Sequence, residues 1–199
     1  MSRAGVREAR VDDVDRLAPV IARAFADDPI TTWIFGPPPT FEIALRILAR
    51  DVYLPRGRIA LAGDGAGAAM WLPPRAAANP SPYALLRFAF SVLPRVGVDR
   101  LRRVAGASAT FARAKPRAPH LYLFALGVDS AARGRGFGVG LVRDGLAVAD
   151  ARGWPTYLET SRPENLRFYA RLGFSIEREV ILAPTAPKTW TMMREPAPA

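Results

Sequence analysis

Several residue types are missing or rare in this chain of 199 residues, and each absence removes a class of chemistry. There is no cysteine, which excludes disulfides, thiolate metal sites and cysteine nucleophiles. His120 is the single histidine, so a cluster of several histidines cannot form and no metal is expected. We expect His120 itself to have a structural role.

Long apolar runs are also missing. The run from Leu121 to Val128 is far shorter than the roughly 20 residues that a membrane-spanning helix needs. The N-terminal residues carry charge where a signal peptide would be apolar. We therefore expect a cytoplasmic protein without a membrane partner.

Lysine is rare too, with only two among 28 basic residues, and the formal net charge is +10. Between Arg87 and Arg117, eight basic residues accompany one acid, Asp99, so this segment supplies +7 of the charge. Such a segment could bind nucleic acid or another polyanion. Few aromatic residues lie among these charges, which favours a solvated helical face. A nucleic-acid-binding module remains an alternative.

Hydrophobic periodicity predicts alternating strands and helices in one domain over residues 1–195, with a disordered tail at 196–199. Strands are expected at 6–11, 58–61, 66–72, 120–128, 156–160, 174–182 and 189–194. Helices are expected at 12–27, 40–54, 81–115 with a break near 94–97, 138–152 and 163–172, and an apolar turn at 30–35. The strand at 120–128 lacks polar alternation, as expected of a central strand buried on both faces.

A glycine-rich loop follows this strand and leads into an amphipathic helix. It reads Asp129-Ser-Ala-Ala-Arg-Gly-Arg-Gly-Phe-Gly-Val-Gly140. Glycine permits positive φ and a close approach of the backbone, so successive N–H groups can converge on an anion. The helix N-terminus and the side chains of Arg133 and Arg135 add positive charge at the same point. These residues predict a diphosphate-binding loop.

The spacing in this loop excludes two common phosphate motifs. There is no Gly-Lys-Ser/Thr for a Walker loop, and Leu141 stands where the dinucleotide motif needs its third glycine. The segment Arg133-x-x-Gly136-x-Gly138 resembles the R/Q-x-x-G-x-G/A motif of the GCN5-related N-acetyltransferase (GNAT) family. In that family the loop holds the pyrophosphate of coenzyme A.

A second motif lies about thirty residues further on. Residues 165–174 are similar to the pattern N-x-x-F-Y-x-x-x-G-F of the same family. Pro163 at the start and Gly173 beyond the end predict a short helix, on which Asn165 and Tyr169 share a face. In the family the tyrosine lies beside the coenzyme A sulfur, so the resemblance implies a functional role for Tyr169.

The resemblance covers about residues 4 to 194. It implies a mixed α/β (α+β) GNAT fold with a central, mostly antiparallel sheet flanked by helices, as a monomer or homodimer. It also implies acetyl-CoA as cosubstrate, with its pantetheine arm along the backbone of β-strand residues 126–128. The cofactor-binding residues implied are Leu126, Val128, Arg133, Gly134, Arg135, Gly136, Phe137, Gly138, Val139, Asn165 and Tyr169. Within the family, residues 24–29, 69–73, 158–161 and 189–192 are similar to the puromycin N-acetyltransferase group.

The expected function is transfer of the acetyl group of acetyl-CoA to a primary amine of a small molecule. Without cysteine, a thiol acyl-enzyme is excluded and direct attack is the simplest mechanism. The resemblance implies that Tyr169 protonates the departing sulfur as general acid. The catalytic base stays open among Glu159, Asp27 and Asp28, and a water chain would need none of them. A non-catalytic coenzyme A-binding regulatory domain is a further alternative.

An acceptor site is expected around the end of the first helix. Asp27 and Asp28 would attract a protonated amine, while Trp33, Phe35 and Trp71 would offer flat apolar walls. This favours an amine carried on an aromatic or hydrophobic body over a polycationic aminoglycoside. In the competing interpretation, the two acids only terminate a helix and the aromatic residues fill the core.

Overall fold

Seven strands form one mixed sheet in the computed structural model, which describes residues 5–36, 38–76, 78 and 80–197. The strands are β1 (Val6–Glu8), β2 (Arg58–Ala62), β3 (Gly67–Leu72), β4 (Leu121–Val128), β5 (Thr156–Thr160), β6 (Ser175–Val180) and β7 (Thr189–Arg194). Their order is β1-β2-β3-β4-β5-β7-β6, and every neighbouring pair is antiparallel except the parallel pair β4 and β5. The predicted mixed, mostly antiparallel sheet is confirmed.

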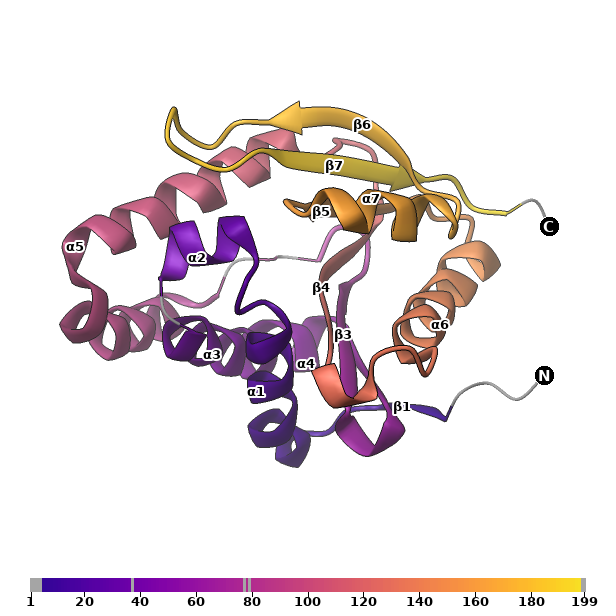
Figure 1. Cartoon of the computed structure of the whole chain (residues 1–199), viewed down its shortest axis with the longest axis horizontal. Helices are drawn as coiled ribbons and strands as arrows, with labels where there is room; N and C mark the ends of the chain where they lie inside the picture. Colours follow the sequence, from indigo (N-terminus) through magenta and orange to yellow (C-terminus); the bar gives the residue numbers. More distant parts are fainter. Residues whose placement is uncertain (1–4, 37, 77, 79, 198–199) are drawn as a thin grey trace.

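Helices cover both faces of this sheet (Figure 1). They are α1 (Val14–Ala24), α2 (Pro29–Phe35), α3 (Pro38–Leu48), α4 (Leu54–Arg56), α5 (Pro82–Ala114), α6 (Phe137–Ala151) and α7 (Pro163–Ala170), with a π-helical turn at Ala49–Tyr53. On one face, α1 and α3 form an apolar core with strand residues such as Met70 and Tyr157. On the other face, α6 and α7 pack around Trp71, Leu158 and Phe174.

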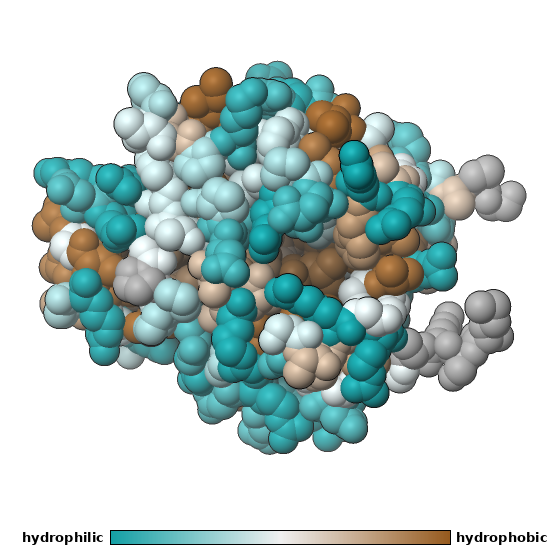
Figure 2. Space-filling view, in the orientation of Figure 1, coloured by the Kyte–Doolittle hydropathy of each residue, from teal (hydrophilic) through white to brown (hydrophobic). Residues whose placement is uncertain are grey.

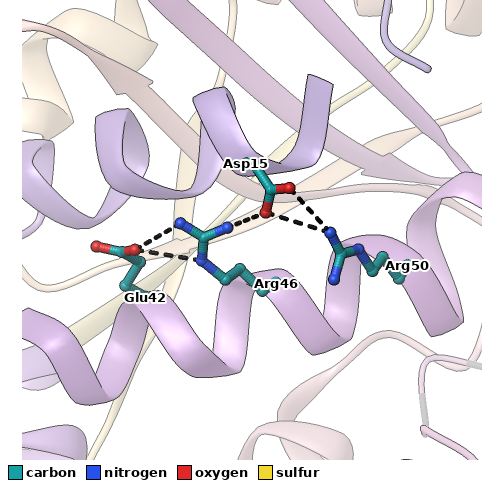
Figure 3. Close-up of polar contacts among 4 residues, drawn as sticks. All are labelled: Asp15, Glu42, Arg46 and Arg50. Atoms are coloured by element: carbon teal, nitrogen blue, oxygen red, sulfur yellow. Dashed lines mark hydrogen bonds and ion pairs between the residues drawn. The ribbon is translucent and has the colours of Figure 1, made fainter. Parts of the chain in front are cut away.

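An ion-pair network joins α1 to α3 (Figure 3). Asp15 of α1 accepts hydrogen bonds from Arg46 and from Arg50, the latter at 3.2 Å. Arg46 also pairs with Glu42, one turn earlier on α3, at 2.8 Å. Because these side chains are partly or largely exposed, each pair contributes little free energy. Burial of apolar side chains such as Leu17 holds the two helices together.

The central strands separate part-way along their length. β4 and β5 pair only from Leu121–Leu123 to Thr156–Leu158. Beyond this point β4 continues beside β3 as far as Val128, while β5 continues beside β7. The predicted strand with two buried faces holds for the first half of β4, whereas in its second half buried and half-buried residues alternate. The sheet therefore opens between β4 and β5.

The longest helix, α5, bends near its middle. Gly97 has φ 72° and ψ 174°, a conformation outside the helical region that glycine adopts at little cost. Pro94 lies just before this bend. The predicted helix at 81–115 with a break near 94–97 is confirmed.

The segment expected to be an apolar turn is the helix α2. Asp28 is its N-cap and accepts a hydrogen bond from Thr31 N at 2.8 Å, and Pro29 occupies the first helical position. The prediction of a turn was wrong because the Asp28-Pro29 pair, which cannot continue the preceding helix, is also a favourable start for a new one. The first strand is also shorter than expected, since Val11–Asp13 form a 3₁₀ turn.

No helix in the described part of the chain combines the length and apolar character needed to span a membrane. The tail predicted to be disordered, 196–199, falls partly outside the described residues. Within them, Ala197 N donates to Asp150 Oδ1 at 2.8 Å.

Candidate active site

The glycine-rich loop connects β4 to α6 with a backbone that only glycine adopts easily. Gly134 and Gly136 have φ values of 77° and 81°, and Gly136 is the N-cap of α6. Within the described part of the chain, a β-carbon built at either position would meet no atom within 4 Å, so the space beside these two glycines is open. The N–H groups of the first turn of α6 have no partner within the helix and can bind an anion.

Charged side chains hold this loop and surround it. Arg23 of α1 pairs with Asp129 at 2.8 Å and keeps the pKa of that carboxyl below its usual range. Arg133 and Arg135 are exposed, and the guanidinium of Arg135 lies 5.0 Å from the centre of the Phe137 ring. The loop is therefore fixed at its start, and its two arginines remain available to a phosphate group.

β4 is pressed against α1 just before the loop. A β-carbon on Gly127 would lie 2.8 Å from Ile21 Cα, so only glycine allows this close packing. Gly127 separates Leu126 from Val128, the two residues expected to pair with a pantetheine arm. The edge of β4 that carries them faces the opening toward β5. Sequence reasoning did not anticipate this role of Gly127.

A small cavity of about 70 Å³ lies where β4 and β5 separate. Five residues predicted for the site lie on its wall: Leu126, Asp28, Glu159, Asn165 and Tyr169. Other wall residues were not predicted, namely the aromatic residues Phe25, Phe111 and Phe124. Figure 2 shows a hollow with apolar side chains near the middle of the view, bordered by hydrophilic ones. The sheet opening thus gathers carboxylates, a tyrosine and apolar rings.

Tyr169 lies on α7 and is buried, with 7% of its surface exposed. Its ring contacts those of Phe168 and Phe174 edge-on, at centroid distances of 5.0 and 5.6 Å. Burial raises the pKa of Tyr169, so its hydroxyl keeps its proton at neutral pH. One turn earlier, Asn165 Nδ2 donates to Thr160 Oγ1 at 3.1 Å and ties α7 to the end of β5.

Asp28 and Ser161 meet on the wall of the cavity. Asp28 is 5% exposed, and its Oδ2 accepts a hydrogen bond from Ser161 Oγ at 2.6 Å. The hydroxyl of Ser161 also accepts a hydrogen bond from Ile30 N at 3.4 Å, and so it contacts the start of α2 rather than α7. The N-cap residue of that helix is Arg162, without a capping side-chain bond.

Glu159 carries a buried carboxylate atom, Oε1, without a hydrogen-bond partner among the described residues. Burial raises the pKa of Glu159, while the positive charge of Lys115 and the hydroxyl groups of Tyr122 and Tyr157 act in the opposite direction. Lys115 Nζ lies 3.5 Å from the centre of the Tyr122 ring, and burial lowers its pKa. Sequence reasoning placed Lys115 in a solvated basic segment and missed this position.

The other expected acceptor residues lie outside the cavity wall. Asp27 is exposed. Trp33 lies under the guanidinium of Arg103 at 5.0 Å, and Phe35 packs on Phe41 with ring centroids 4.9 Å apart. Trp71 is 1% exposed and lies on the opposite face of the sheet, under α6. Trp71 therefore does not line this cavity.

His120 contacts an aromatic ring and a backbone carbonyl, and in the described part of the chain it belongs to no cluster of metal-binding side chains. The ring of His120 lies 5.2 Å from that of Tyr157, and its Nδ1 is 2.8 Å from Ala118 O. Burial lowers the pKa of His120. Among the described residues, no three His, Asp or Glu side chains form a group that could hold a metal ion.

Known proteins resemble this chain in sequence and in fold. Residues 83–174 match the model of the Acetyltransferase (GNAT) family. The chain thus contains a GNAT acetyltransferase domain. Enzymes with this domain are acetyl-CoA-dependent N-acetyltransferases, and this chain is an acyltransferase of that kind. The grouping with puromycin N-acetyltransferase remains a prediction.

Solved GNAT structures share the whole fold. The crystal structure of histone acetyltransferase HPA2 and related acetyltransferase from Corynebacterium glutamicum has 25% identity and a TM-score of 0.73, and the match covers 98% of this chain and 97% of that one. Arylalkylamine N-acetyltransferase 2 from Aedes aegypti has 15% identity and a TM-score of 0.64, covering 96% and 97%. The Drosophila melanogaster polyamine N-acetyltransferase has 18% identity and a TM-score of 0.61, covering 96% and 98%.

In this GNAT protein the basic segment 87–117 is partly used inside the fold. Arg100 donates to Thr32 O at 2.9 Å, and Arg103 donates to Trp33 O at 3.2 Å. Both carbonyl groups lie near the C-terminal end of α2, where positive charge is favourable. Lys115 is half-buried against the Tyr122 ring, so three of the eight basic residues make contacts within the fold, which weakens the nucleic-acid alternative.

Proposed function

We propose that this protein acetylates a primary amine of a small molecule by direct attack of the amine on acetyl-CoA. The observation that carries the proposal is the separation of β4 from β5. At this separation Leu126 of β4 and the buried Tyr169 line one cavity, and the glycine-rich loop follows directly after the end of β4. Such an arrangement can hold a thioester and an amine within reach of each other, which is the main requirement for this transfer.

Acetyl-CoA would lie along β4 and α6. The backbone groups of Gly134, Gly136, Phe137, Gly138 and Val139, with the side chains of Arg133 and Arg135, would hold the pyrophosphate. The positive φ values of Gly134 and Gly136 and the open space beside them support this assignment. Leu126 and Val128 would pair with the pantetheine arm, because pairing with β5 has ended before them.

Tyr169 would act as the general acid. The nitrogen of the neutral amine attacks the thioester carbonyl, the carbon–sulfur bond breaks, and the thiolate takes the proton of the tyrosine hydroxyl. The raised pKa of Tyr169 supports this role, since the hydroxyl is fully protonated before the transfer. Asn165 would keep α7 in place through its bond to Thr160.

Glu159 is the base that fits best. Its Oε1 atom is buried without a hydrogen-bond partner in the described part of the chain, whereas the carboxylate of Asp28 accepts hydrogen bonds from Thr31 N and Ser161 Oγ. The raised pKa of Glu159 brings it closer to that of an effective base at neutral pH. We assign to Glu159 the proton that the amine loses, and to Asp28 the attraction of a protonated amine to the cavity.

The acceptor would be an amine on an apolar or aromatic body. Phe25, Phe111 and Phe124 line the cavity, and they replace the expected aromatic walls. Solved relatives in this fold are named for arylalkylamines, polyamines and agmatine, which are all small amines.

A panel of amines with acetyl-CoA, followed by release of free thiol, tests the proposal. Turnover of an arylalkylamine, with a raised KM in an Asp28→Asn variant and an unchanged KM in Asp27→Asn, would support it. Efficient acetylation of aminoglycosides alone would contradict the acceptor assignment. Binding of coenzyme A without turnover of any amine would favour a non-catalytic domain.

A further inference from the structure

The first half of α5 exposes an apolar face to solvent. Tyr83, Leu86, Phe90 and Leu93 are 69%, 55%, 71% and 38% exposed. Their spacing of three, four and three residues places them in one stripe along the helix. We call this stripe the outer face of α5. Figure 2 shows apolar side chains among charged ones at the left end of the molecule, where α5 turns in Figure 1.

The opposite side of the same segment faces the protein through Ala84 and Val92, which are buried. Packing against the protein therefore accounts for the apolar residues on the inner side of this helix. The outer face has no such packing partner among the described residues. A surface helix normally places polar residues outward, so an aligned row of large apolar side chains marks an interaction site.

Positive charge borders the outer face. Arg87 extends along the helix with its guanidinium 5.8 Å from the centre of the Tyr83 ring, and Arg95 follows two turns later. Residues 82–98 contain no acidic residue, and Arg102 beyond the bend is largely exposed. An apolar stripe with arginines beside it suits a surface that offers both hydrocarbon and negative charge.

A second copy of the chain fits this face poorly. Residues 82–93 form a helix about 18 Å long and 10 Å wide, which exposes on the order of 200 Å². Stable protein interfaces bury about 800 Å² on each partner. Two-fold pairing through this face would also bring Arg87 and Arg95 close to their own copies, with no acid in the segment to offset the repulsion.

We propose that the outer face of α5 binds to an anionic phospholipid surface, with the apolar side chains among the acyl chains and the arginines at the phosphates. The sequence analysis expected no membrane partner because the chain lacks a spanning segment. A helix that lies in the interface plane needs none. This proposal is independent of the acetyl transfer, because it rests on a surface that does not contribute to the cavity wall.

Vesicle flotation tests the proposal with the full-length protein. One set of vesicles contains phosphatidylcholine only, and the other contains equal parts of phosphatidylcholine and phosphatidylglycerol. We expect binding to the anionic vesicles alone, with a loss of at least about tenfold in Leu86→Asp/Phe90→Asp. Replacing Arg87 and Arg95 by Gln should weaken binding by about fivefold per residue, and added salt should weaken it as well.

Ile181→Asp is the matched control, because Ile181 is 66% exposed but lies after β6. It should bind vesicles like the wild type, and circular dichroism should show all variants folded. Equal loss in the control, or no binding of the wild type to anionic vesicles, would overturn the proposal. A wild-type dimer that Leu86→Asp/Phe90→Asp converts to a monomer in sedimentation would show a self-interface instead and would also overturn it.

Discussion

Ser161 Oγ donates a hydrogen bond of 2.6 Å to the buried carboxylate of Asp28, and so connects the end of β5 to the start of α2. The two residues are 133 positions apart in the chain. Asp28 also caps α2 through Thr31 N. One carboxylate thus begins a helix and fixes the distance between two walls of the cavity.

Replacing Asp28 should lower stability as well as activity. Asp28→Ala removes the cap and leaves the Ser161 hydroxyl without its acceptor, which together cost about 2–3 kcal/mol. For a chain of this size we expect a fall in Tm of several degrees. Asp27→Ala is the control, because Asp27 is exposed and should change stability by no more than about 0.5 kcal/mol. Equal Tm values for the two variants would contradict the role of Asp28.

Gly136→Val should weaken acetyl-CoA binding at least about tenfold in calorimetry, because valine at φ 81° is strained and narrows the loop. Gly138→Ala is the matched control. A β-carbon there would lie 3.7 Å from Val128 Cγ2, an ordinary contact, and affinity should be nearly unchanged. Unchanged affinity in a folded Gly136→Val variant would place the pyrophosphate elsewhere.

Tyr169→Phe should reduce kcat by roughly 10²–10⁴-fold while acetyl-CoA affinity holds, since only the proton donor is lost. Tyr83→Phe removes an exposed hydroxyl on α5 and should leave kcat unchanged. If Tyr169→Phe turns over at the wild-type rate, the proton comes from another source.

The pH dependence of activity should reflect Glu159. Its pKa is raised by burial, so the carboxylate forms only as the pH rises through that higher value, and kcat/KM should rise with it. Lys115→Met removes a charge that stabilises the carboxylate, and the rising limb should move to higher pH. Glu159→Gln should abolish the limb. A limb that is unchanged in both variants would assign the base to water or to another group.

The same group should affect folding in the opposite sense. Between the pKa of the unfolded chain and the higher pKa of the folded one, the folded protein binds more protons, so its stability falls as the pH rises. In Glu159→Gln, the free energy of unfolding measured with urea should no longer fall as the pH rises between these two pKa values. An identical pH dependence of stability in the variant would mean that burial of Glu159 has no net cost.

Gly145→Ala should destabilise the protein by about 1–3 kcal/mol, because its β-carbon would lie 2.3 Å from the Trp71 ring. Gly106→Ala on α5 has no atom within 4 Å of the new carbon and should add up to about 1 kcal/mol through helix propensity. Denaturant unfolding measures both. Equal stability of the two variants would contradict the close packing of α6 on Trp71.

Local signals in the sequence predicted most of the fold. The bounds of β5 and β7 were predicted correctly because each is a short run rich in β-branched and aromatic residues with a proline close to both of its ends. The break in α5 followed from Pro94 and Gly97. Residues 30–35 were predicted as a turn rather than as α2 because an Asp-Pro pair can both end one helix and begin the next.

The positions of several site side chains depend on contacts between distant parts of the chain, which local sequence patterns do not predict. A register shift between Met70 and Trp71 interrupts the pairing of β3 with β4, and in a strand buried on both faces the residue pattern does not tell which face Trp71 occupies. Lys115 lies near the end of the basic segment 87–117, yet it is half-buried where the chain returns from α5 to β4. Phe111 lines the cavity from the part of α5 that follows the bend at Gly97.

The short contact between β4 and β5 divides the sheet into two halves joined by three residue pairs. The glycine-rich loop belongs to one half together with β4 and α6. Tyr169 on α7 belongs to the other half together with β5, β6 and β7. A ligand that contacts both halves would link them across the line where β4 and β5 separate. Its binding free energy would then add to the free energy needed to pull the two halves of the sheet apart. Amide hydrogens along β5 and β7 should then exchange more slowly when acetyl-CoA is bound.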